Sequence, residues 1–239
     1  MKKLDKNLPI GVFDSGIGGL CVLKELADFF PCENFIYFGD NLNAPYGNKD
    51  LNTLKALTAN AVDRLKGEGV KALVIGCNTL SSNLYRFVKE RAGVPVIKTL
   101  PPKCKDKNKV LLCTVKTAES NFVKRFFKGR VIGLRNLAGD IEKSVFNLEQ
   151  INLDFLVNSI PKTASGVVLG CTHYHYVKPI IESLSKIPVE DGYKRVKFSL
   201  RKVLKKQKLF KNSKNRAIKF IGESSNFNEK VYYFHLSKG

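Results

Sequence analysis

Two short stretches of the 239-residue sequence place a cysteine in the same setting. ALVIGCNT covers residues 72–79 and GVVLGCTH covers residues 166–173, so Cys77 and Cys171 each follow an apolar run and a glycine. At a strand-to-helix turn, a side chain lies near the first N–H groups of the helix. There the pKa of a thiol falls below its usual value of about 8.5, and the thiol becomes a usable base near neutral pH. The repeated pattern therefore favours acid–base chemistry by two thiols.

A symmetric pair of thiols suits the inversion of a carbon centre. One thiolate removes a proton from a stereogenic carbon while the opposite thiol delivers a proton to the other face, and the roles exchange with the handedness of the substrate. Such a reaction needs no cofactor and no metal. A single cysteine of this kind could also be a nucleophile or a redox sensor. Alternatively, the two cysteines are unrelated buried residues at strand ends with no chemical role.

The other four cysteines carry no metal-binding or redox motif. No two cysteines of the chain are three positions apart, so there is no C-x-x-C pair. We interpret Cys21, Cys32, Cys104 and Cys113 as small hydrophobic residues with free thiols, as is usual in a reducing compartment.

Polar turns elsewhere in the chain suit an anionic substrate. FDSGIGGL places Asp14 and Ser15 at a strand end before a glycine-rich helix start, where backbone N–H groups can approach a carboxylate. The same pair could serve only as a helix cap. Nucleotide binding is not indicated, because Cys21 stands where the third glycine of the dinucleotide fingerprint belongs and no P-loop motif occurs.

Further polar residues stand where they could hold a bound anion. In the turn-rich loop 38–50, Tyr46 and Gly47 follow Pro45 and could close over a cleft, or form an ordinary turn. The residues that follow the two thiols offer hydroxyl groups and helix caps. They are Asn78, Thr79, Ser81 and Ser82 after the first thiol, and Thr172 and His173 after the second.

Apolar, β-branched runs alternate with segments of helical periodicity along the chain. Continuous apolar strands separated by helices are typical of a parallel sheet covered on both faces. The predicted strands are PIGVFD (9–14), FIYFGD (35–40), ALVIGC (72–77), VPVIKT (94–99), KVLLCT (109–114), GVVLGC (166–171) and IPVED (187–191).

The order of these elements repeats. The second copy trails the first by 94 residues at Cys77 and Cys171, and by 93 at Pro95 and Pro188. We therefore predict an α/β fold of two pseudo-symmetric lobes, each a mainly parallel sheet flanked by helices, with residues 101–109 crossing between them. Ligands of open α/β sheets bind beyond the carboxyl ends of the strands, so we expect the active site between the lobes.

The chain carries a formal charge of +20 that is unevenly distributed. From residue 191 to 239, fourteen Lys and Arg residues stand against three acidic residues. Such a segment could meet nucleic acid or anionic lipid. We interpret it as a solvated helix face, because residues 196–209 space their apolar side chains as one stripe and no nucleic-acid-binding motif accompanies the charge. We therefore do not expect nucleic acid as a partner.

No segment predicts secretion or membrane insertion. Asp5, Asn7 and Pro9 interrupt any apolar signal region at the lysine-rich N-terminus, and no apolar stretch of about 18 residues occurs. We expect a cytoplasmic protein with no membrane partner.

Four stretches of the sequence match motifs of a known family. They are IGVFDSGIGGL, YFGD with PYG, GCNT, and LGCTHY, and they stand in the family's order over nearly the whole chain. On these motifs the chain resembles the cofactor-independent glutamate racemases of the aspartate/glutamate racemase superfamily. The resemblance implies racemisation of glutamate without a cofactor, supply of D-glutamate for peptidoglycan in the cell wall, and commonly a homodimer.

The resemblance also implies roles for single residues. Cys77 would act on the D-enantiomer and Cys171 on the L-enantiomer, while Asp14 and His173 assist proton transfer. The implied glutamate-binding residues are Asp14, Ser15, Tyr46, Gly47, Asn78, Thr79, Thr172 and His173. The family's first lobe is completed by C-terminal residues, which implies a first lobe of residues 1–99 plus about 192–239 and a second lobe of residues 100–191.

The sequence departs from the family's pattern in three places. Asn43 stands where relatives usually have Arg, and His175 where a proline is usual. The stretch after Arg130 is short, so the auxiliary carboxylate that the family supplies there is Asp140 or Glu142. Two other functions stay open: a racemase for aspartate or another small acidic amino acid, and a catalytically weakened scaffold that binds nucleic acid through its basic C-terminal region.

Overall fold

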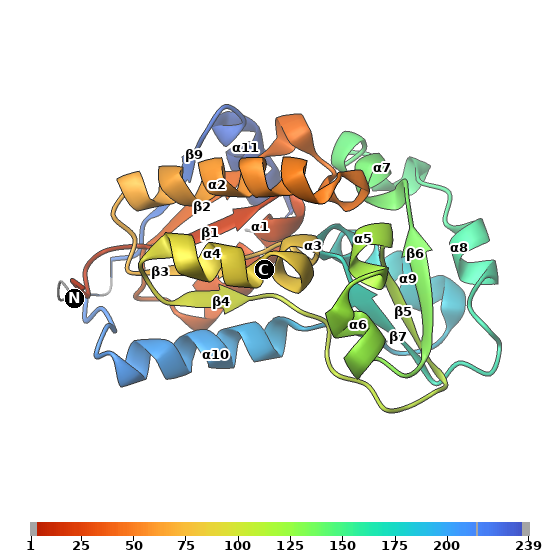
Figure 1. Cartoon of the computed structure of the whole chain (residues 1–239). Coiled ribbons are helices and arrows are strands. Elements are labelled where there is room, and N and C mark those ends of the chain that lie inside the picture. The colour runs from red at the N-terminus through yellow and green to blue at the C-terminus, as the bar shows by residue number, and fades with distance from the viewer. Residues whose placement is uncertain (1–3, 214, 236–239) are drawn as a thin grey trace.

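Two parallel sheets organise the chain in a computed structural model that describes residues 4–213 and 215–235 (Figure 1). Residues 1–3, 214 and 236–239, which belong to the predicted first lobe, lie outside this description. In spatial order the first sheet holds β4 (Val96–Lys98), β3 (Ala72–Ile75), β1 (Ile10–Asp14), β2 (Phe35–Gly39) and β9 (Ile218–Ile221). The second sheet holds β6 (Arg130–Leu134), β5 (Lys109–Thr114), β7 (Gly166–Gly170) and β8 (Val189–Glu190).

The two sheets have the same internal order. The sequence β4-β3-β1-β2 of the first sheet matches β8-β7-β5-β6 of the second, and every pairing is parallel. The predicted α/β fold of two pseudo-symmetric lobes is therefore confirmed. In the first sheet β9 adds a further strand that pairs with β2 from the C-terminal part of the chain. The exact division of the chain into lobes at residues 99/100 and 191/192 stays a prediction.

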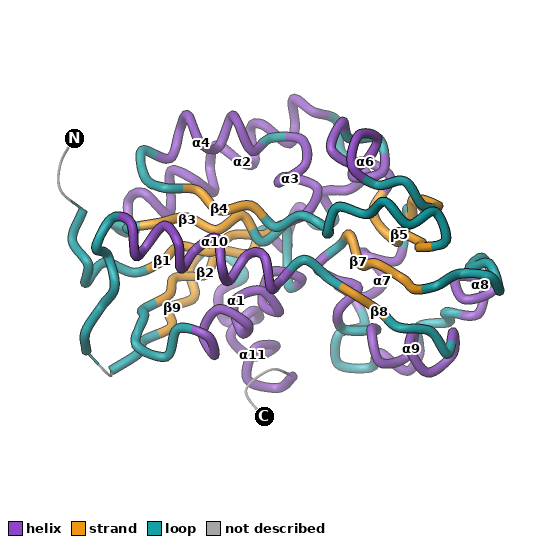
Figure 2. The backbone as a smooth tube through the Cα atoms, turned by 90° about the horizontal axis from the view of Figure 1, so that it is seen from below, coloured by secondary structure: helices purple, strands orange, loops and turns teal. Residues whose placement is uncertain are grey.

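Helices cover both faces of the first sheet (Figures 1 and 2). The α-helices are α1 (Gly18–Phe29), α2 (Leu51–Gly67), α3 (Asn78–Asn83), α4 (Tyr85–Ala92), α5 (Val115–Ala118), α6 (Asn121–Phe126), α7 (Leu137–Lys143), α8 (Asp154–Asn158), α9 (Lys178–Ser185), α10 (Tyr193–Lys206) and α11 (Ser225–His235). The 3₁₀ turns are η1 (Asn41–Asn43), η2 (Tyr46–Asn48), η3 (Leu148–Gln150) and η4 (Thr172–His175). None of the helices in the described part of the chain is long and apolar enough to cross a membrane.

Successive side chains of a strand point to opposite faces of the sheet, so each strand contributes to the core on both sides. In β1, Val12 packs with the cluster that contains residues of α1, α10 and α11, while Phe13 packs with the cluster that contains residues of α2 and α4. In β3, Val74 and Ile75 divide in the same way. Because both faces are buried, the strands read as continuous apolar runs, which is the pattern that identified them in the sequence.

The edge strand β6 is not among the strands predicted from the sequence. β6 lies at the edge of the second sheet, where it pairs only with β5, and its residues Arg130, Val131 and Gly133 are exposed. An edge strand has a neighbour on one side only, so it need not carry the continuous apolar run of a central strand.

A buried ion pair joins the loops at the amino ends of the first sheet. Lys71 Nζ lies 2.5 Å from Glu33 Oε2, the two side chains are 0% and 2% exposed, and the backbone N–H of Lys211 donates to Glu33 at 3.0 Å. Loss of one partner leaves the other charge buried and unpaired, so Glu33→Gln should lower the free energy of unfolding by about 3–5 kcal/mol.

Urea unfolding measures this effect, and an exposed pair supplies the control. The Arg86 and Glu90 side chains are 93% and 66% exposed, so Glu90→Gln should change stability by less than about 1 kcal/mol. Equal losses in the Glu33 and Glu90 variants would contradict the prediction.

Candidate active site

The two thiols lie at equivalent turns and reach the same cavity. Cys77 follows β3 and directly precedes α3, and Cys171 follows β7 and directly precedes η4, so each lies in the turn just beyond the carboxyl end of a central strand. Both side chains are buried. They line a cavity of about 10 Å³ together with Ser15, Pro45, Tyr46, Gly47, Asn78, Thr79, Thr114, Ala138, Thr172 and His173. The cavity thus lies where the sequence predicts the active site, between the two lobes.

On the side of Cys77, the surroundings favour the neutral thiol. Its sulfur lies 4.0 Å from Ser15 Oγ, and Ser15 donates from its backbone N–H and its hydroxyl to Asp14 Oδ1. Thr172 of the other lobe donates to Asp14 Oδ2 at 2.9 Å. Burial, and then the charge of Asp14, raise the pKa of Cys77. Burial likewise raises the pKa of Asp14, although the positive charge of His173 and the hydrogen bonds from Ser15 and Thr172 counteract part of that increase.

On the side of Cys171, the surroundings supply a proton-bearing partner. His173 Nδ1 lies 3.9 Å from Cys171 Sγ, and His173 Nε2 lies 2.6 Å from Glu142 Oε2. Burial lowers the pKa of His173, but the hydrogen bonds to Cys171 and Glu142 and the charge of Glu142 outweigh it and raise this pKa well above its usual value of 6.5. These interactions favour the protonated form of His173.

A glycine allows this close approach of the two lobes. A Cβ atom at Gly18, the first residue of α1, would lie 2.6 Å from both His173 Nδ1 and Thr172 Oγ1. Any side chain there would push η4 away from α1. The glycine-rich segment after Asp14 thus serves the packing of the second thiol's turn against the first lobe.

The resulting site is chemically asymmetric. Cys77 sits among hydroxyl groups and a carboxyl group, whereas Cys171 sits beside the imidazole ring of His173. A cation beside a sulfur stabilises negative charge on it. The two thiols therefore have different neighbours, a carboxyl group and hydroxyls on one side and an imidazole on the other.

The remaining predicted binding residues also meet at this cavity. The Tyr46 hydroxyl donates to Asp40 at 2.5 Å, and the Asn78 amide donates to the Thr99 carbonyl at 3.3 Å. Thr79 Oγ1 lies 3.0 Å from Thr114 Oγ1, so a hydroxyl pair links the lobes. Asp14 does not line the cavity; it lies behind Ser15 and Thr172, to which it is hydrogen bonded. Ser81 and Ser82 do not line it either, and their hydroxyls donate to the backbone carbonyls of Ile75 and Asn78.

Several residues of the site were not predicted from the sequence. Thr114 ends β5, the counterpart of β1, and it lines the cavity as Ser15 does after β1. The signal was present, because Thr114 is the last residue of the predicted strand KVLLCT (109–114). Of the two candidate auxiliary carboxylates, Glu142 contacts His173 while Asp140 is exposed.

Two departures from the family's pattern have simple structural accounts. The Asn43 amide donates to both carboxylate oxygens of Asp40, at 2.9 and 3.1 Å, so it supports the loop that carries Tyr46. His175 stacks on Tyr193 with ring centroids 4.0 Å apart, and burial lowers its pKa to about 4. His175 is thus a neutral packing residue and takes no part in the charge of the site.

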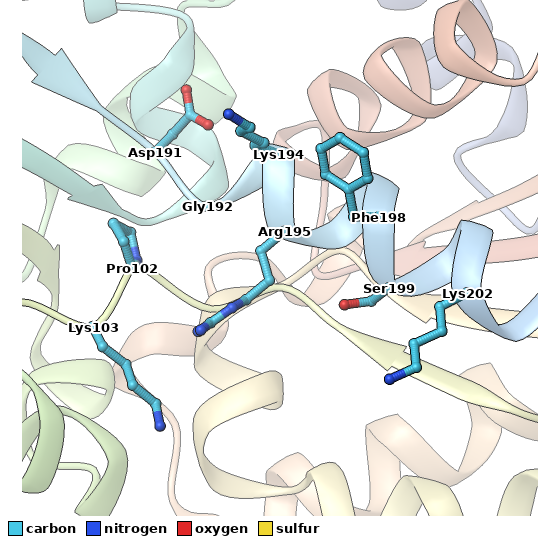
Figure 3. Close-up of a pocket in the computed structure, with 9 residues that line it drawn as sticks. All are labelled: Pro102, Lys103, Asp191, Gly192, Lys194, Arg195, Phe198, Ser199 and Lys202. Carbon is cyan, nitrogen blue, oxygen red and sulfur yellow. The ribbon is translucent and has the colours of Figure 1, made fainter.

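A larger cavity lies on the basic surface of α10 and contains no thiol. It measures about 570 Å³ and is lined by Pro102, Lys103, Asp191, Gly192, Lys194, Arg195, Phe198, Ser199 and Lys202. Its cationic groups project from α10 and from the crossing segment between the lobes (Figure 3). It carries none of the predicted site residues, so the small cavity between the thiols is the candidate active site. Lys214 and Lys238 of the basic C-terminal segment lie outside the described residues.

The chain is similar to known proteins over almost its whole length. A glutamate racemase from Clostridium novyi is 38% identical, with 94% of each chain covered. One from Clostridium acetobutylicum is 35% identical, with 84% of this chain and 86% of that protein covered. No family model matches the sequence.

Solved structures agree with these relatives. A glutamate racemase from Thermus thermophilus, in complex with β-chloro-D-alanine, has a TM-score of 0.80 at 27% identity and covers 95% of this chain and 93% of its own. One from Francisella tularensis, in complex with D-glutamate, has a TM-score of 0.76 at 27% identity, with coverages of 97% and 95%. Because several relatives exceed 30% identity over most of their length and share the fold, the chain belongs to the glutamate racemase family.

Proposed function

We propose that the protein interconverts L- and D-glutamate by a two-thiol mechanism without a cofactor. The observation that carries the proposal is that two buried thiols, one from each pseudo-symmetric lobe, line a single cavity with hydroxyl and amide groups between them. The names and ligands of the relatives support glutamate and do not favour aspartate, another small acid or nucleic acid.

Cys171 takes the α-proton of L-glutamate and Cys77 delivers a proton to the opposite face of the same carbon. The bond from Cα to its hydrogen breaks as the Cys171 S–H bond forms, and the Cys77 S–H bond breaks as the new bond to Cα forms. His173 supports the charge on Cys171 before the transfer. The reaction of D-glutamate follows the same steps with the two thiols exchanged, assisted on the Cys77 side by Asp14.

Apart from His173, the donors available to glutamate are uncharged. Among the described residues that line the cavity there is no Lys or Arg, so hydroxyl, amide and backbone N–H groups must receive the substrate's carboxylates. Ser15, Thr79 and Thr172 supply hydroxyls, and Asn78 supplies an amide at the start of α3. We assign Tyr46 and Gly47 to the loop that closes over the substrate.

The size of the cavity requires movement during turnover. A space of about 10 Å³ holds no more than about one water molecule, so an amino acid enters only when the lobes or the Tyr46 loop move apart. Closure then excludes water from the two thiols.

The cellular role follows from the family resemblance. We propose that the enzyme acts in the cytoplasm and supplies D-glutamate for peptidoglycan synthesis, and so contributes to cell-wall formation and cell shape. By the same resemblance we propose a homodimer, which sedimentation of the purified protein tests.

Circular dichroism of the purified protein with L- or D-glutamate, without added pyridoxal phosphate, tests the proposed activity. We expect either enantiomer to reach an equal mixture, with one solvent deuterium incorporated at Cα per inversion in D₂O. Aspartate and other small acidic amino acids, run in parallel, should react more slowly. Folded protein that produces neither signal with glutamate would refute the proposal.

A further inference from the structure

The C-terminal helix α11 contacts both lobes. It follows β9, which pairs with β2 of the first sheet. From its other side, Phe227 packs edge-to-face on Phe146, with ring centroids 6.1 Å apart, and His235 Nε2 donates to the Val145 carbonyl. Both partners lie just beyond α7, the helix that carries Glu142. The helix α11 therefore fixes the segment next to this carboxylate.

A chain of side-chain hydrogen bonds runs from α11 to the active site. Asn228 of α11 is completely buried, and its Nδ2 donates to Asn41 Oδ1 at 2.8 Å. Asn41 Nδ2 in turn donates to Glu142 Oε1, and Glu142 Oε2 receives the N–H of His173. Each link joins residues far apart in the sequence, and the chain ends on the imidazole beside Cys171.

The charge of the carboxylate fixes the orientation of both amides. An ionised carboxylate only accepts hydrogen bonds, so Asn41 must turn its NH₂ group toward Glu142 and its oxygen toward Asn228. Asn228 must then offer its own NH₂ group. Its Oδ1 is buried without a hydrogen-bond partner among the described residues. A buried polar atom without a partner carries a free-energy cost. The fold accepts this cost at Oδ1, so it is the NH₂ group of Asn228 that makes the hydrogen bond to Asn41.

We propose that Asn41 and Asn228 are positioning residues for proton transfer, because they hold the Glu142 carboxylate against His173. The inference rests on the proposed function, in which His173 supports Cys171. Without Asn41, the only donor left to the Glu142 carboxylate besides His173, among the described residues, is the backbone N–H of Ile17 at 3.1 Å. The Glu142 side chain is already 12% exposed. It would then turn toward solvent for part of the time and leave His173.

Other titratable groups face this pair from several elements. They are Asp14 of β1, Tyr37 of β2, Tyr176 after η4, and Cys171. Substitution at Asn41 or Asn228 removes no charge from any of them. A change in the titration of His173 would therefore report on the position of Glu142.

Nuclear magnetic resonance of the imidazoles tests the proposal directly. The chain has three histidines, His173, His175 and His235, so the resonances can be assigned by single substitutions. In Asn41→Leu the pKa of His173 should fall relative to the wild type, because the support of Glu142 weakens. Asn228→Leu should shift it in the same direction by a smaller amount. Leucine is close in size to asparagine and lacks its polar groups.

Kinetics supply a second measurement. Asn41→Leu should lower kcat about tenfold, a part of the 10²- to 10⁴-fold contribution of positioned acid–base groups, with little change in KM. The alkaline limb of the pH profile should move to lower pH. Asn226→Leu is the matched control, since Asn226 is an exposed residue of the same helix, and it should leave both the titration and kcat unchanged.

The outcomes separate this inference from the proposed function. If His173 titrates as in the wild type in folded Asn41→Leu and Asn228→Leu proteins, the inference is wrong. Thermal unfolding identifies a variant that fails to fold. Asn41→Leu is the safer of the two, because Asn41 is partly exposed whereas Asn228 is completely buried. The pKa of His173 could fall in the variants as expected while the wild-type protein racemises no glutamate. That result would refute the proposed function and leave the positioning of Glu142 intact.

Discussion

Replacement of either Cys77 or Cys171 by serine is expected to lower kcat for glutamate racemisation by about 10³-fold in both directions. Serine keeps the size and place of the side chain, but its hydroxyl ionises far less readily than a thiol and forms no base near neutral pH. Each thiol is the base for one enantiomer and the acid for the other. Loss of one therefore slows both reactions, as circular dichroism started from each enantiomer would measure.

Cys104→Ser is the matched control for these variants. Cys104 is also buried, but it packs in a small apolar cluster with Leu111, Val123 and Phe127 and donates to the Asp106 carbonyl at 3.5 Å. It does not line the cavity. Its replacement should leave kcat within about twofold of the wild type. A loss as large as that of the Cys77 variant would show that serine acts by disturbing the fold.

Glu142→Gln is expected to lower kcat about 10²-fold and to move the alkaline limb of kcat/KM to lower pH. Burial alone lowers the pKa of His173, and the hydrogen bond and charge of Glu142 are among the effects that raise it. Glutamine keeps a hydrogen bond but removes the charge, so the imidazolium loses its proton at a lower pH. Initial rates between pH 6 and pH 10 would measure the shift.

The same variant should change the pH dependence of stability. A histidine whose pKa is raised by folding contributes stability that is fully present below its unfolded pKa of about 6.5 and is lost as pH rises through the folded value. Glu142→Gln should therefore be less stable than the wild type at pH 6, and the difference should shrink at alkaline pH. Asp140→Asn removes an exposed carboxylate of the same helix and should change neither profile.

The sequence by itself determined the fold class and most of the candidate site. Its continuous apolar runs predicted the central strands, because a strand buried on both faces must be apolar throughout. The repeat of Gly-Cys at the ends of β3 and β7 predicted the two thiols, since the carboxyl end of a parallel strand is where a side chain reaches the cleft. Local residue chemistry was sufficient for these features.

Only the tertiary structure decided between Asp140 and Glu142, and only it revealed the parts played by Asn41 and Asn228. The two acids lie two positions apart on one short helix, and the sequence offers no reason to prefer either. A helix turns about 100° per residue, so the packing of α7 sends one carboxylate to solvent and the other to His173. The partners of that carboxylate come from η1 and α11, which are joined by folding alone, and a contact between segments so far apart has no local pattern in the chain.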